Sequence, residues 1–199
     1  MKKQKLLILP LATLALFMSF ASGCSKDDDE NNKTYEYFTD PRDGVSYKTL
    51  QIGDQVWMAE NLRYLPMVVE PDSGSHIIPL YYVLAYEGNN LNEAKASEYY
   101  KTYGTLYNWA AAQQACPPGW HLPTEAEWMQ LADFIGGAGT AGDKLKESGT
   151  SHWGVVSDEI TDEYGFTALP GGCCLSNGLF DGLEDFATWW TKTEIDTAQ

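Results

Sequence analysis

The clearest chemical prediction comes from the residues around Cys24, which indicate a covalent modification of its thiol. Cys24 directly follows residues 21–23 (Ala-Ser-Gly), and a lipoprotein signal peptidase accepts only small side chains before the cysteine at its cleavage site. Upstream, a basic segment (residues 1–5) leads into a largely apolar run (residues 6–21), which is the layout of a secretory signal peptide. The sequence therefore predicts a signal peptide over residues 1–23 and a lipid anchor on Cys24.

A transmembrane anchor is the alternative interpretation of the same apolar run. The run is short for a span, Pro10 interrupts it, and no basic flank follows it. Residues 25–33 contain no apolar side chain, which predicts a solvated tether. A lysine followed by acids at this place also resembles the surface-export signal of Bacteroidetes-type lipoproteins. We therefore expect an outer-membrane lipoprotein exposed at the cell surface, with an acidic tether over residues 24–39.

The three other cysteines are an odd number, Cys116, Cys173 and Cys174. Outside the cytoplasm a disulfide is permitted, so Cys116 is a candidate to pair with Cys173 or Cys174, and the remaining thiol suggests a missing partner. A redox or nucleophilic role needs a CxxC spacing or a neighbouring base to lower a thiol pKa, and the sequence offers neither.

The histidines and acids do not form a recognisable metal motif. His76, His121 and His152 are far apart, and the apolar neighbours of His121 favour a packed, hydrogen-bonded side chain. Acids in residues 158–163 and 181–185 have suitable oxygens for calcium but lack EF-hand spacing, so solvated charge is the competing interpretation. We expect no metal and no cofactor.

Trp153, Trp189 and Trp190 are the candidate ligand-binding residues. They lie in loop-rich sequence, where exposed rings would stack on sugar faces; the competing interpretation is that they cover a small core. Removal of the signal peptide leaves 10 basic against 28 acidic residues, a net charge of −18. So acidic a chain excludes nucleic acid as a partner and leaves the lipid as its membrane contact.

The first half of the remaining chain predicts few regular elements. Turn residues at 41–44 precede a β-hairpin over residues 45–58, with its turn at Gly53 and Asp54. Residues 67–92 predict an irregular excursion with one short strand. We expect helices over residues 93–100 and 107–115.

The strongest local signal is a helix that begins at Thr124. Thr124 and Glu127 form a capping box, Trp128, Leu131 and Ile135 then share one face, and glycines at 136–137 end the helix. Beyond residue 139 the sequence predicts loops with short strands at 166–169 and 187–191. The fold class is therefore α+β, one domain over residues 40–199 with long loops.

Five sequence blocks resemble one known family. They are DGVSYKTLQIGDQVWMAENLRYLP, YGTLYNW, CPPGWHLPTEAEWMQL, GDKLKESGTSHW and GFTALPGG followed by ATWWTKTE. In this order they are similar to the Fibrobacter succinogenes major paralogous domain. The resemblance implies a compact domain related to C-type-lectin-like and formylglycine-generating-enzyme-like folds, in a family whose molecular function is not established.

Two departures from the family pattern affect what the resemblance implies. Members continue past the Trp-Trp block into further strands and a closing cysteine, so the resemblance implies a C-terminal truncation and a lost partner for Cys116. Residues 173–174 also differ from the usual aromatic or basic pair. No motif matches the cysteine arrangement of formylglycine-generating enzymes, so the resemblance transfers no active site.

Three functions stay open on these observations. The first is a surface binding or adhesion module for a glycan or a neighbouring surface protein. The second is a structural surface lipoprotein or truncated remnant without a ligand, and the third is an enzyme of the formylglycine-generating type. We expect the binding module and no enzymatic activity; the oligomeric state is open.

Overall fold

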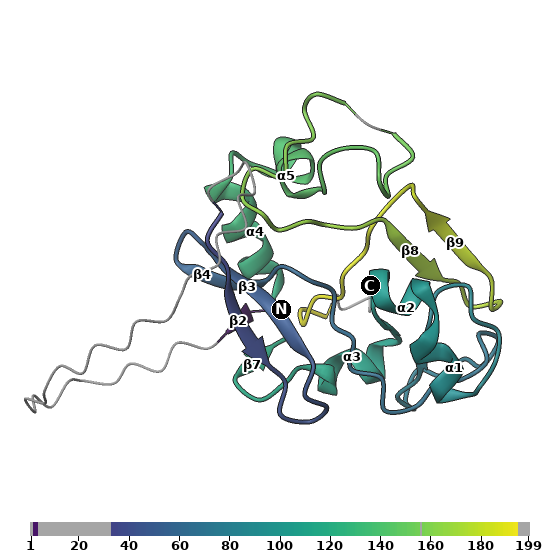
Figure 1. The fold of residues 1–199 in the computed structure, drawn as a ribbon. Helices are drawn as coiled ribbons and strands as arrows, with labels where there is room; N and C mark the ends of the chain where they lie inside the picture. Colours follow the sequence, from purple (N-terminus) through teal and green to yellow (C-terminus); the bar gives the residue numbers. More distant parts are fainter. Residues whose placement is uncertain (1, 4–32, 156, 195–199) are drawn as a thin grey trace, which may run out of the picture.

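The computed structural model describes residues 2–3, 33–155 and 157–194 (Figure 1). Its main element is a five-stranded antiparallel sheet in the order β2-β3-β4-β1-β7. The strands, in that order, are Glu36–Thr39, Ser46–Ile52, Gln55–Met58, Lys2–Lys3 and Trp120–His121. The centre of this sheet therefore combines segments that are far apart in the sequence.

The predicted hairpin over residues 45–58 is confirmed as β3 and β4. Ile52 pairs with Gln55, and Gly53 adopts the positive φ of 57° that the tight turn between them requires. Leu50, Ile52 and Trp57 are buried on one sheet face, as the alternation of the strand predicts. The hairpin is thus the framework on which the first core is built.

Helix α4 (Glu125–Phe134) covers that face of the sheet. Its capping box is confirmed: Thr124 Oγ1 accepts from Glu127 N–H, and the Glu127 carboxylate accepts from Thr124 N–H at 2.9 Å. Leu131 and Ile135 are each 1% exposed in a core cluster with Trp57, and Trp128 packs against it. The sequence-predicted helix face is therefore the one that makes the core.

Helices α1 (Leu91–Ala96), α2 (Glu98–Tyr103) and α3 (Trp109–Ala115) build the other half of the molecule (Figure 1). The single helix predicted over residues 93–100 is wrong, because Ser97 is extended, ends α1 and caps α2 through its hydroxyl. The predicted helix at 107–115 begins two residues later, since Tyr107 belongs to a two-stranded sheet of β5 (Tyr81–Tyr82) and β6 (Leu106–Tyr107). The short strand predicted in the irregular excursion is thus β5.

The C-terminal region differs most from the prediction. Helix α5 (Ala138–Leu145) forms where the sequence predicts loops. Its N-cap residue is Gly137, which provides no side-chain hydrogen bond. The strands predicted at 166–169 and 187–191 are wrong, since each contributes only one bridge residue, Ala168 and Ala187. The regular pairing lies between them, in the hairpin of β8 (Gly171–Cys174) and β9 (Phe180–Leu183).

The folded domain begins earlier than residue 40. Strand β2 lies within the range predicted as tether, and Lys33 Nζ contacts Asp162 Oδ2 at 3.1 Å. Cys24 and most of the signal peptide and tether lie outside the described residues. None of the described helices is long and apolar enough to cross a membrane.

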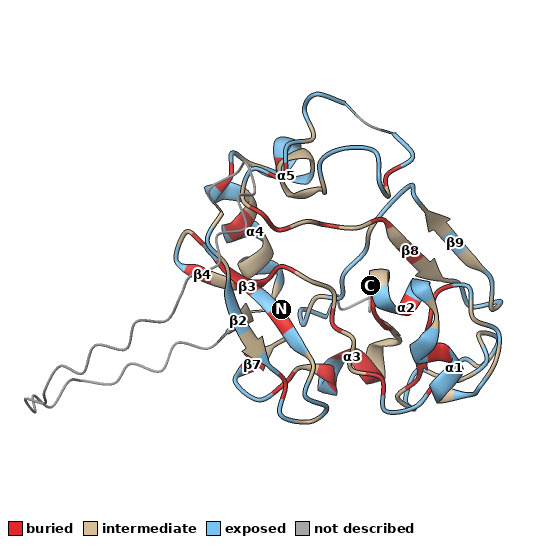
Figure 2. Cartoon of the chain, in the orientation of Figure 1, coloured by how far each residue is buried: buried red, intermediate tan, exposed pale blue. Residues whose placement is uncertain are grey.

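The described residues form five helices and small antiparallel sheets, which confirms the α+β class. Figure 2 shows buried residues on β3 and β4, on the inner sides of the helices and on several connecting segments, while the outer loops are exposed. The two halves, one built on the main sheet with α4 and α5 and one on α1–α3, contribute side chains to a common pocket.

Candidate functional site

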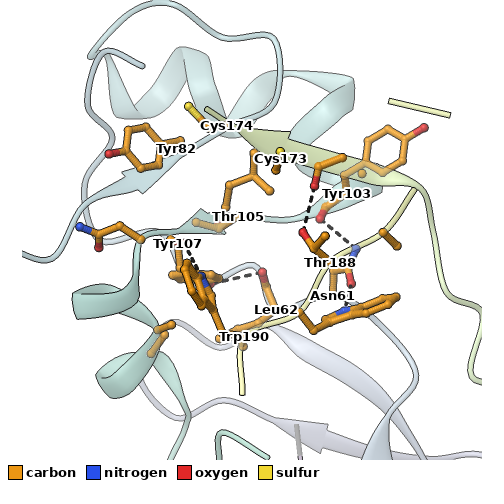
Figure 3. Close-up of a pocket in the computed structure, with 18 of the residues that line it drawn as sticks. Asn61, Leu62, Tyr82, Tyr103, Thr105, Tyr107, Cys173, Cys174, Thr188 and Trp190 are labelled. Carbon is orange, nitrogen blue, oxygen red and sulfur yellow. Dashed lines mark hydrogen bonds between the residues drawn. The ribbon is translucent and has the colours of Figure 1, made fainter. Parts of the chain in front are cut away.

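A pocket of about 930 Å³ lies between the segment after β4, the β5–β6 region, the β8 strand and the C-terminal segment. This volume is in the range of small-molecule sites. Figure 3 shows side chains from several elements converging on it, with the β8 cysteines toward one end and Trp190 toward the other. The lining includes Asn61, Thr105, Cys173, Cys174, Trp189 and Trp190.

Trp190 is held at the pocket wall by two contacts. Its Nε1–H donates to Tyr107 O at 2.6 Å, and its ring lies 5.5 Å from the ring of Trp109, measured between centroids. The side chain is nevertheless 46% exposed. Trp190 therefore presents a fixed, accessible aromatic surface.

Trp189 is fixed in a different way. Its ring packs against Trp128 and Phe166, each at 6.1 Å between centroids, and its Nε1–H donates to Asn61 Oδ1 at 3.4 Å. It is 43% exposed. Because contacts within the protein fix both tryptophans, binding to them would involve little loss of side-chain freedom.

Trp153, the third candidate, does not line the pocket. It is 8% exposed, its Nε1–H donates to Ala168 O at 3.0 Å, and the Lys146 ammonium lies 5.0 Å from its ring centroid. Burial leaves no face for stacking, so this part of the expectation is corrected: the structure brings together Trp189 and Trp190 and separates Trp153 from them.

The polar groups of the pocket are mostly engaged within the protein. Asn61 Nδ2 donates to Tyr103 O at 3.1 Å, and Thr188 Oγ1 donates to Gly172 O at 3.4 Å. The Thr105 hydroxyl is fully buried beside Tyr107 and makes no hydrogen bond of normal geometry among the described residues. Because this hydroxyl is shielded from solvent, Thr105 belongs to the buried wall of the pocket.

The three described cysteines are free thiols, so the predicted disulfide from Cys116 is not formed. Cys116 packs against the core cluster that contains Tyr47 and Trp120, whereas Cys173 and Cys174 line the pocket from β8. Burial raises the pKa of Cys116 to about 11. The pKa of Cys173 is raised by burial and by Asp181, and that of Cys174 by burial and by Cys173, so these thiols are poor nucleophiles at neutral pH.

Two of the three histidines and one clustered acid are engaged in local pairs. His121 Nε2 lies 3.0 Å from Glu127 Oε2, and His152 Nδ1 lies 2.8 Å from Glu147 Oε2. Asp162, from one predicted acidic cluster, accepts from Thr167 N–H at 2.8 Å. Within the described part of the chain, no group of three or more His, Cys, Asp or Glu residues is arranged to hold a metal ion.

Sequence reasoning missed Asn61 and Thr105. Asn61 follows the predicted hairpin, and a polar residue is common after a hairpin. Thr105 lies between the helices predicted over residues 93–100 and 107–115, whose bounds differ from those of the structure. Both residues lie in sequence blocks that carry the family resemblance, Asn61 in residues 43–66 and Thr105 in residues 103–109. Membership of these blocks was the signal that could have identified them.

Comparison with known proteins gives one match. The model of a family described as the Fibrobacter succinogenes major domain matches residues 50–199. The chain matches no curated protein and no solved structure.

Proposed function

The chain belongs to the family of the Fibrobacter succinogenes major domain, and from its pocket and its N-terminal sequence we propose that it is a lipid-anchored binding module of the cell surface whose pocket takes a glycan. Residues 1–23 act as the signal peptide, and acylated Cys24 anchors the mature chain in the outer membrane. The domain has a C-type-lectin-like arrangement, and it acts by binding rather than by catalysis.

The pair of half-exposed tryptophans carries the proposal. Sugar rings have one apolar C–H face and a rim of hydroxyls, so they suit a site with fixed aromatic faces and a few polar groups. Trp189 and Trp190 are 43% and 46% exposed and are both hydrogen-bonded to the pocket wall.

The chemistry of the pocket favours binding over catalysis. Burial raises the pKa of both thiols, and Asp181 beside Cys173 and Cys173 beside Cys174 raise it further. A nucleophilic or oxidative thiol needs the opposite shift. This argues against the formylglycine-generating alternative.

The test is a glycan-array screen of the soluble chain beginning at Lys33, with a thermal melt of the same sample. We expect saturable binding to a selective set of polysaccharides. Trp190→Ala should weaken it about tenfold or more, because a buried stacking contact is worth at least about 1.4 kcal/mol. Tyr37→Ala is the matched control, since Tyr37 is 69% exposed on β2 and lies outside the pocket.

The outcomes separate the three functions. A cooperatively melting chain that binds no glycan refutes the glycan proposal and favours a structural role. Oxygen-dependent turnover of a cysteine-containing peptide would favour the enzyme. A melt without a cooperative transition would favour the truncated remnant.

A further inference from the structure

The side chains that line the pocket are nearly free of charge. Among the described lining residues, Glu60 is the carboxylate and His76 is the imidazole, while the others are apolar, aromatic or neutral polar groups. Glu60 is already paired, because its Oε1 lies 3.2 Å from Arg63 Nη1 and its Oε2 accepts from Lys48 N–H. His76 is exposed on the loop before β5. The described lining therefore offers a ligand no lysine or arginine cation and no unpaired carboxylate.

The titratable thiols and phenols of the pocket wall are neutral as well. Figure 3 shows these groups on the walls of the pocket: Cys173, Cys174, Tyr82, Tyr103 and Tyr107. Burial raises the pKa of each of them above its ordinary value. At neutral pH these side chains are therefore uncharged, and they add contact area and hydrogen-bonding groups to the wall without adding charge.

Carboxylates outside the lining give the β8 end of the pocket a negative potential. Burial raises the pKa of Cys173, and Asp181 raises it further. Burial likewise raises the pKa of Tyr103, and Glu184 and Glu147 raise it further. A negative charge favours the neutral form of an acidic group, so these shifts report the sign of the field at the wall. Because the whole chain also has a net charge of −15, an anionic ligand is repelled both at a distance and at the wall.

A charged sugar would lose its hydration in this pocket without gaining a partner. A uronic acid or a sulfate ester is ionised at neutral pH, and burial of an ion without a counter-charge is costly. A protonated amino sugar has the same cost, because Glu60 already pairs with Arg63. Hydroxyl and N-acetyl groups are neutral and lose less on burial, while the C–H face of a sugar ring gains contact with the exposed rings of Trp189 and Trp190.

We infer that the site selects uncharged glycans, so that its ligand is a neutral polysaccharide and glycans with carboxylate or sulfate groups are excluded. This inference rests on the proposed glycan function and adds the substrate class. The neutral lining and the pairing of Glu60 support it directly. A pocket for an acidic polysaccharide would have arginine or lysine in its wall, because these side chains recognise such anions.

Binding of matched polymers by the full chain tests the inference. Hydroxyethyl cellulose, dextran, xylan and galactomannan are each compared with their carboxymethylated derivative, which has the same backbone and added carboxylates. We expect each neutral polymer that is bound to bind at least about tenfold more tightly than its derivative. This ratio should remain at about 1 M salt, where the Debye length falls to about 3 Å and repulsion by the whole chain is screened.

A cation placed in the pocket should weaken the exclusion. Thr188 is exposed, lines the pocket and precedes Trp189, so Thr188→Lys adds an ammonium group to the described lining. We expect this variant to bind the carboxymethylated polymers about three- to tenfold more tightly than the parent does. Thr39→Lys is the matched control, because Thr39 is an exposed residue of β2 outside the pocket, and it should leave the ratio unchanged. An unchanged ratio in a cooperatively melting Thr188→Lys variant would mean that the lining does not set the selectivity.

The outcomes distinguish this inference from the function on which it rests. Array hits confined to neutral glycans support it, even where none of the four polymers is bound. Derivatives that bind as tightly as their neutral parents, or array hits confined to sulfated, uronic-acid or amino-sugar glycans, overturn the inference and leave the glycan function standing. A ratio that disappears at about 1 M salt assigns the exclusion to the net charge of the chain and overturns it as well. A folded chain that binds none of these polymers and no glycan on the array refutes the proposed function and the inference together.

Discussion

Glu127 makes the stability of the domain depend on pH in a defined range. Burial alone would raise the pKa of this carboxyl, but hydrogen bonds from Thr124 N–H, Lys2 and His121 outweigh it and lower the pKa from 4.5 to about 2. The difference corresponds to roughly 3.4 kcal/mol at about 1.36 kcal/mol for each pKa unit. Solvent screening at a 21% exposed side chain reduces this to about 2 kcal/mol.

The sign follows from the direction of the shift. A carboxyl whose pKa is lowered by folding stabilises the native state fully above its unfolded value of 4.5, and this stabilisation is lost as the pH falls toward 2. Glu127→Gln cannot ionise but keeps an acceptor for the Thr124 N–H. We therefore expect the variant to be about 2 kcal/mol less stable than the parent at pH 7 and nearly equal to it at pH 2.

Urea unfolding of the full chain at pH 7, 4.5, 3 and 2 measures this difference, with Glu125→Gln as the control at every pH. The reasoning would be refuted if the parent and Glu127→Gln differed by the same free energy at pH 7 and pH 2. Equal stability at pH 7 would refute it as well, since the ionised carboxylate would then contribute nothing.

Three further predictions concern the core. Leu131→Ala, at a 1% exposed position, should lower the free energy of unfolding, measured in urea, by about 2–5 kcal/mol. Met129→Ala is the control, because Met129 is 47% exposed on the same helix, and it should change this free energy by less than about 0.5 kcal/mol. Arg42→Met should lower the free energy of unfolding by about 3–5 kcal/mol, because Arg42 Nη2 lies 2.6 Å from the fully buried Asp40 carboxylate. The double variant with Asp40→Asn should recover part of this loss, because it removes the unpaired buried charge. Cys116 should resist iodoacetamide at pH 8 until the chain unfolds, since a pKa of about 11 leaves about one thiolate in a thousand; rapid labelling found by mass spectrometry would contradict this.

The elements that sequence predicts best are those with local determinants. The capping box at Thr124 and the tight turn at Gly53 depend on residues within four positions of each other, and both are confirmed. The break at Ser97 also has a local cause, because this extended residue is both the C-cap of α1 and the N-cap of α2. A search for helical periodicity does not detect such a break.

The C-terminal region could not be predicted because its structure depends on distant contacts. Helix α5 has two glycines in its span and no side-chain cap, so its stability comes from packing of Ala141 and Leu145 on the first core. Strand β8 contains Gly171 and Gly172, which have weak strand preference, and it is fixed by pairing with β9.

The candidate site was predicted in part. Trp189 and Trp190 are exposed rings, as their loop-rich sequence predicts, but sequence alone did not separate them from Trp153, which is buried and donates to Ala168 O. Thr105 could not be identified, since an unpartnered hydroxyl is a property of the packed structure.

The position of Lys2 and Lys3 inside the sheet ties the start of the chain to its middle. Lys2 pairs with Trp57 and with His121, so β1 is the strand that joins β7 to the rest of the main sheet. Strands β3 and β4 are joined by a tight turn and close a short loop, whereas the pairings of β1 with β4 and with β7 close long loops. The main sheet therefore combines one fast local pairing with pairings that cost more chain entropy and form later.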